Sequence, residues 1–209
     1  MNNNEKIEIS IAITRYCISI SSPDTSQPAI AEDAFPRERE CNEHIVPESV
    51  TELCSTNFMY CDSLKRIVLH KNLCYINEGS FYGCINLCSF DVAEDNPCYT
   101  SIDGVLFDKT KTTLLAYPPG KKAAFYKIPY GVKRISKGAF ANCKYLEDLI
   151  VPETVVSAGE WFFEGTFMRI HCNENSIVRK HFGDNPSESE MEIISEHNRR
   201  IRNGDDSGI

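Results

Sequence analysis

The sequence predicts an α/β solenoid, mostly β, in which short parallel strands and small helical turns repeat and a single β-hairpin interrupts the repeat. Five phenylalanines recur in one frame with a 23-residue period, which a single 59-residue gap interrupts. They are Phe35, Phe58, Phe81, Phe140 and Phe163. A fixed period of roughly 20 to 50 residues is typical of stacked repeats, so the frame predicts a solenoid.

Other positions keep the same frame, which distinguishes a repeat from a coincidence of phenylalanines. Cysteines follow three residues after the phenylalanine, leucines follow six after it, and an apolar residue usually stands five before it. The cysteines are Cys61, Cys84 and Cys143, and the leucines are Leu64, Leu87 and Leu146. The best copy of the unit runs from Pro129 to Pro152. These positions define the inward side chains of each predicted coil.

Each unit combines extended segments with one helical turn. Leu146, Leu149 and Val151 have the near-alternation of a short strand, which Pro152 ends because proline lacks an N–H for the sheet. The step of three residues from Phe140 to Leu146 is typical of a helical turn. A coil of this kind buries its inward side chains only by stacking on neighbours, about 4.8 Å away.

Two segments carry a resemblance to a known family. Ile128 to Cys143 and Ile76 to Leu87 resemble the BspA-like leucine-rich repeats, a 23-residue class found in bacterial and protist surface proteins. The resemblance covers about residues 30 to 183. It implies a parallel-strand solenoid with a concave face, and it implies binding of other proteins or of host surfaces.

The 59-residue gap is longer than two repeat periods, and its sequence predicts a β-hairpin. Tyr99 to Phe107 is one apolar run, Asp108 to Thr112 is a polar turn, and Thr113 to Pro118 is a second run. The segment resembles the hairpin module that interrupts repeats in the same family. We therefore expect the hairpin, about residues 97–120, inside the repeat architecture.

The predicted organisation is one repeat domain between two different ends. Residues 1–29 read as an N-terminal strand and a degenerate repeat that cap the solenoid, and residues 30–183 as the repeat domain. The C-terminal cap spans about 170–183, with Ser176 as helix N-cap and Gly183 as its stop. Residues 184–209 are polar, with one short helix about Met191 to Arg202, and are expected to be disordered.

Charge and hydropathy limit the class of partner. The net charge is −8, so no dominant basic surface for nucleic acid is expected. No run approaches the roughly 18 consecutive apolar residues of a membrane span. The start of the chain does not read as a signal peptide, which predicts a cytoplasmic protein. The family resemblance favours the alternative, a secreted or cell-surface protein.

Ten cysteines raise the question of disulfides, metal binding or nucleophilic catalysis. We interpret Cys61, Cys84 and Cys143 as buried thiols in a recurring core slot, and Cys41 and Cys172 as inward as well. The other five lie outside the recurring slot: Cys17, Cys54, Cys74, Cys88 and Cys98. Their oxidation state stays open, and titration of native thiols would decide between a reducing compartment and export.

Neither a metal site nor a catalytic centre is predicted. Cys41 with His44, His70 with Cys74, and His171 with Cys172 form close pairs, but no pair has the four converging ligands of structural zinc. No nucleophile elbow, phosphate-binding loop or H-E-x-x-H motif occurs. We expect no enzyme activity, no cofactor and no bound metal.

The predicted function is therefore non-enzymatic protein binding through the variable, outward positions of the concave strand face. The candidate residues are Lys65, Arg66, Ser89, Asp91, Glu147 and Asp148. Two alternatives remain: an adhesin that binds host or matrix proteins, and a structural solenoid that associates with itself through its end coils.

Overall fold

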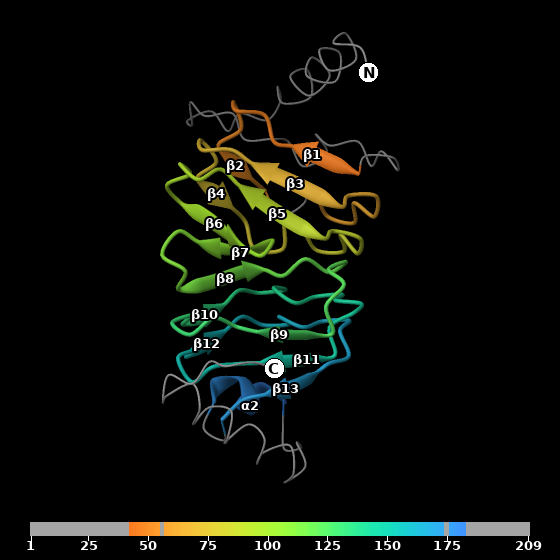
Figure 1. Cartoon of the computed structure of the whole chain (residues 1–209), viewed down its shortest axis with the longest axis vertical. Coiled ribbons are helices and arrows are strands. Elements are labelled where there is room, and N and C mark those ends of the chain that lie inside the picture. Colours follow the sequence, from red (N-terminus) through yellow and green to blue (C-terminus); the bar gives the residue numbers. More distant parts are fainter. Residues whose placement is uncertain (1–41, 55–56, 174–175, 183–209) are drawn as a thin grey trace, which may run out of the picture.

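The computed structural model describes residues 42–54, 57–173 and 176–182 of the 209-residue chain. Short strands stack along the long axis of the molecule, in two rows joined by turns (Figure 1). Thirteen strands and one short helix, α2 (Ile177–Phe182), are present in these residues. The predicted mostly β solenoid is confirmed.

The first row holds the strands that begin just after the leucine position of the repeat, as after Leu64 and Leu146. Its sheets have the orders β1-β3-β5 and β9-β11-β13, and all their pairs are parallel. Arg66 pairs with Ser89, so consecutive coils align with the 23-residue period. The strands are β1 (Glu43–Ile45), β3 (Arg66–Leu69), β5 (Ser89–Val92), β9 (Phe125–Lys127), β11 (Asp148–Ile150) and β13 (Arg169–His171).

The second row lies on the other side of the coils and contains the insertion. One sheet has two parallel strands, β2-β4, and the other has the order β12-β10-β8-β7-β6. The strands of this second row are β2 (Glu52–Leu53), β4 (Tyr75–Ile76), β6 (Tyr99–Ile102), β7 (Val105–Asp108), β8 (Thr113–Ala116), β10 (Arg134–Ile135) and β12 (Ser157–Ala158). β8 pairs parallel with β10, so the insertion continues the row.

The insertion has one more turn than the sequence analysis predicted. Residues 99–107 form two antiparallel strands, β6 and β7, and not one run. Asp103 and Gly104 connect them, with φ values of 50° and 78°. Positive φ at both central residues is the signature of a type I′ turn, for which Asp-Gly is a preferred sequence. The insertion is therefore a three-stranded meander.

The core follows the repeat frame. Phe58, Phe81 and Phe140 are buried, and the rings of Phe58 and Phe81 stack with centroids 5.6 Å apart. Tyr117, which precedes Phe140 by one repeat period, occupies the same slot and stacks on Phe140 at 5.3 Å. The 59-residue gap therefore contains one full repeat that ends in a tyrosine.

Two core assignments differ from the prediction. In the last coil Phe162 is fully buried and Phe163 only partly, because Phe162 occupies the slot that Ala139 fills one coil earlier. The two rings meet edge to face at 5.0 Å. Cys84 and Cys143 are buried as expected, whereas Cys61 is only partly buried. Cys172 is buried, as predicted.

The C-terminal end of the described chain is capped by α2. Ser176 accepts a hydrogen bond at Oγ from the backbone N of Val178, at 3.2 Å, which confirms it as the N-cap. Val178 is fully buried in the C-terminal core. The predictions for Phe35, Cys17, Cys41, Gly183, the N-terminal strand and the C-terminal tail lie outside the described residues.

Candidate binding face

The outward side chains of β1, β3, β5, β9, β11 and β13 form one surface, which we call the repeat-strand face. In these strands side chains alternate between the core and this face. Ile67 and Phe90 point inward and are buried, while their neighbours Arg66 and Ser89 point outward. All six candidate residues lie on this face or at the strand ends that border it.

Arg66 joins three adjacent strands at one end of the face. Its Nη1 donates to Glu43 Oε1 at 2.8 Å, and its Nε donates to Asp91 Oδ2 at 2.6 Å. These hydrogen bonds, with Asp91 first, raise the pKa of Arg66, so the side chain stays charged. The three groups are solvent-exposed, and pairs of this kind contribute little to stability. They fix the orientation of the charges that a partner would meet.

Asp148 organises a second cluster at the other end of the face. It accepts from Arg169 Nε at 2.7 Å and from Nη2 at 2.6 Å, the two-pronged geometry that suits guanidinium and carboxylate. His171 Nε2 lies 2.6 Å from Asp148 Oδ1. The hydrogen bonds from Arg169 are the main cause that lowers the pKa of the Asp148 carboxyl. Asp148 is therefore a fixed negative charge at neutral pH.

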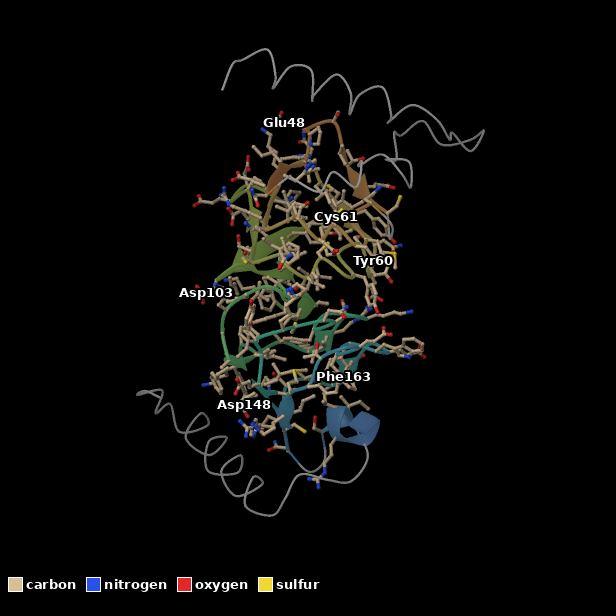
Figure 2. The ribbon with its side chains drawn as sticks, turned by 90° about the vertical axis from the view of Figure 1, so that its right-hand side faces the viewer. Glu48, Tyr60, Cys61, Asp103, Asp148 and Phe163 are labelled. Atoms are coloured by element: carbon tan, nitrogen blue, oxygen red, sulfur yellow. The ribbon has the colours of Figure 1, made fainter. Side chains whose placement is uncertain are left out.

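The Asp103–Gly104 turn lies between the two sheets of the face. Phe90 donates its backbone N–H to Gly104 O at 2.9 Å, and Lys121 Nζ donates to Asp103 O. The turn thus lies beside β5, in the place where a further strand would stand. Figure 2 shows Asp103 and Asp148 on the same side of the molecule, opposite Tyr60 and Phe163. The face continues across the insertion.

The structure brings some of the predicted residues together and separates others. Arg66 and Asp91 are in contact, and Ser89 is the register partner of Arg66. Lys65 and Glu147 are exposed beside the strands, and Asp148 belongs to the second sheet. The candidate set is therefore two charged clusters, one on each side of the turn.

Sequence reasoning missed four residues of the face: Glu43, Phe125, Arg169 and His171. Phe125 is the register partner of Asp148, one repeat period earlier, so the frame could have revealed it. Arg169 pairs with Asp148 at a 21-residue spacing, because the last coil is two residues shorter than the period. A search at a fixed period of 23 residues therefore does not find Arg169 and His171, because they lie two residues earlier than the period predicts.

A small hollow lies between the coil of Phe81 and the coil of Tyr117. Its volume is about 30 Å³, far below the roughly 300 Å³ at which ligand pockets begin. Ser136 Oγ and Tyr117 Oη border it and, within the described residues, have no hydrogen-bond partner. The hollow has room for water and not for a substrate. Elsewhere in the described chain, no three or more metal-ligating side chains converge.

A solenoid with these two strand rows defines the class of leucine-rich repeat proteins. The family model for the BspA type leucine rich repeat region matches in six copies, over residues 14–121 and 120–198. The chain belongs to this family. No protein with curated annotation matches it.

Two crystal structures illustrate the similarity. A leucine-rich repeat protein from Eubacterium ventriosum is 25% identical with a TM-score of 0.52, over 62% of this chain and 42% of its own. The pneumococcal vaccine antigen PcpA is 26% identical with a TM-score of 0.54, over 62% of this chain and 38% of its own. This chain thus spans less than half the length of either relative. None of its described helices has the length and apolar character to span a bilayer.

Proposed function

We propose that this chain is a non-enzymatic scaffold that binds another protein through the repeat-strand face. The observation that carries the proposal is the mixture of exposed apolar and oriented charged side chains on this face. Ile45 is 62% exposed and Phe125 51% exposed, each beside one of the charged clusters. Large exposed apolar side chains supply most of the energy of an interface, and the charges around them supply specificity.

The length of the face suits a macromolecule better than a small ligand. Stacked coils present an extended surface, along which a protein partner can spread its contacts over several repeats. A specific interface needs about 800 Å² from each partner, which several adjacent coils can supply. The candidates Lys65, Arg66, Ser89, Asp91, Glu147 and Asp148 then surround the apolar residues with polar and charged groups.

Capture experiments with matched variants test the proposal. Full-length protein is immobilised, and recovered proteins are compared for wild type, Arg66→Glu, Asp148→Arg and Phe125→Ala. We expect a specific partner to be lost from all three variants. Lys133→Glu is the control, since Lys133 is exposed beside β10 in the other strand row. Retention of every recovered protein by the three face variants would show that binding occurs elsewhere or not at all.

The compartment is the second question. We propose a cytoplasmic location, with the cell surface as the alternative suggested by the similarity to a pneumococcal vaccine antigen. No disulfide joins any of the eight described cysteines in the structure, which suits a reducing compartment. Thiol titration of the native protein, taken directly from its source, distinguishes the two: mostly free thiols favour the first location and paired cysteines the second.

A further inference from the structure

Cys74 and Cys98 lie on neighbouring passes of the chain, although neither belongs to the recurring cysteine slot. Asn96 Nδ2 donates to the backbone O of Leu73 at 3.0 Å. The hydroxyl of Tyr99 donates to the backbone O of Cys74 at 3.2 Å. These bonds hold residues 96–99 alongside residues 73–74, which places the two cysteines side by side.

The two thiols are in contact, and that of Cys74 is open to reagents. The Cys98 side chain is hydrogen-bonded to that of Cys74. Cys74 is exposed, whereas Cys98 is half-buried and packs against the N-terminal core. Burial, followed by the contact with Cys74, raises the pKa of Cys98. The accessible Cys74 is therefore the thiol that a reagent in solution meets first.

The contact between the two side chains brings the sulfurs within reach of a bond. The anchoring hydrogen bonds of Asn96 and Tyr99 use backbone oxygens and not the thiols. The pair can therefore join without breaking these contacts.

We propose that Cys74 and Cys98 form a modification site for small disulfides, at which an intramolecular disulfide closes between β4 and the start of the meander. Cys74, as thiolate, attacks one sulfur of a small disulfide RSSR and releases RS⁻, leaving Cys74–S–SR. Cys98, after losing its proton, attacks the Cys74 sulfur and releases the second RS⁻. The two protons end on the two released thiols, so the dithiol and RSSR become a protein disulfide and two RSH.

The other described cysteines provide internal comparisons. Cys84 and Cys143 are buried, and burial raises the pKa of Cys143 to about 12, which makes both poor targets. Cys88 is exposed, but its thiol donates to the backbone oxygens of Asn86 at 3.2 Å and Gly120 at 3.3 Å and not to a second thiol. We expect Cys88 to retain a mixed disulfide with the reagent. In the Cys74–Cys98 pair, by contrast, the second thiol displaces the reagent.

The test uses the full chain, reduced and then treated with glutathione disulfide. Digestion after glutamate cuts at Glu78 and Glu94 and separates the two cysteines, so only a disulfide keeps their fragments together in non-reducing mass spectrometry. We expect the linked fragments from wild type and from the control Cys88→Ser. The linkage is lost in Cys74→Ser, and Cys98→Ser retains glutathione on Cys74.

Two results would overturn the proposal. One is the absence of the linked fragments from wild type, at a dose where Cys88 carries glutathione. The other is a linkage that survives both Cys74→Ser and Cys98→Ser, since it would then join other cysteines. Circular dichroism of each reduced variant confirms that it is folded. Neither result bears on protein capture by the repeat-strand face, so the two proposals fail separately.

Discussion

His44 stands in an inward row of the first sheet, where its register partner in the next coil is Ile67. Its ring meets that of Phe58 edge to face at 5.2 Å. Burial is the cause that lowers the pKa of His44 from 6.5 to about 4. The folded chain therefore holds a neutral imidazole at a position where the repeat elsewhere places an apolar side chain.

Acid should destabilise the protein through this residue. The unfolded chain binds the proton near pH 6.5 and the folded chain only near pH 4, so stability is fully present above pH 6.5 and falls between these values. At roughly 1.4 kcal/mol per pKa unit, the loss reaches about 3 kcal/mol. Urea unfolding from pH 7.5 to pH 4 measures it.

We expect His44→Ile to remove most of this pH dependence, leaving the contribution of His70, whose pKa burial also lowers. Ile67→Val is the control, since a lost methyl costs about 1 kcal/mol at every pH. An acid loss in His44→Ile as steep as that of wild type would mean that His44 is protonated in the folded chain.

At the scale of elements, the meander depends on its two-residue turn. Gly104 has φ of 78°, and a Cβ there would meet Ser89 Cβ at 3.0 Å. Gly131 has φ of 100°, with no atom within 4 Å of such a Cβ. Both glycines have a positive φ, which favours glycine over other residues. Only Gly104 also lies against a neighbouring strand.

Alanine substitutions at Gly104 and Gly131 distinguish the cost of a positive φ from the cost of a steric contact with a neighbouring strand. We expect Gly131→Ala to lower the free energy of unfolding by about 1 kcal/mol, the typical cost of a left-handed alanine. Gly104→Ala should lose about 2 to 3 kcal/mol, because the Cβ also displaces β5. Urea unfolding of both variants gives the difference. Equal losses would mean that the turn does not support the repeat-strand face.

At the scale of the whole molecule, an end coil must be closed. A solenoid leaves the apolar interior of its last coil open unless a cap covers it. In the described chain α2 covers this end through the fully buried Val178. Self-association through the end coils is the structural alternative to partner binding. The six-residue helix α2 disfavours it at the C-terminal end of the described chain, because it covers the last coil.

Opening this cap should produce the self-association that the native end prevents. We expect Val178→Asp to lower the free energy of unfolding by roughly 3 kcal/mol, because a charge enters the core. Its apparent mass should rise with concentration in light scattering. Val156→Asp is the control, since Val156 is 67% exposed and tolerates the charge. Identical behaviour of both variants would mean that α2 does not close the solenoid.

Much of this architecture could be predicted because the repeat imposes the same environment in each successive coil. Leu64, Leu87 and Leu146 are buried as the frame requires. The Asp-Gly pair at residues 103 and 104 is a known signal for a two-residue turn. We did not predict the turn, because we interpreted Tyr99 to Phe107 as one continuous apolar run. Local sequence signals fail here because an uninterrupted apolar run permits one strand or two.

The sequence by itself determined the solenoid, its period and most inward side chains, because stacked identical coils must bury the same positions. Only the tertiary structure decided how outward residues combine, because those contacts join strands across coils of unequal length. The shortened step that brings Arg169 to Asp148 is one case. The contact of Cys74 with Cys98 is another, since a hydrogen-bonded Asn96 and Tyr99, and not the repeat, align the two thiols.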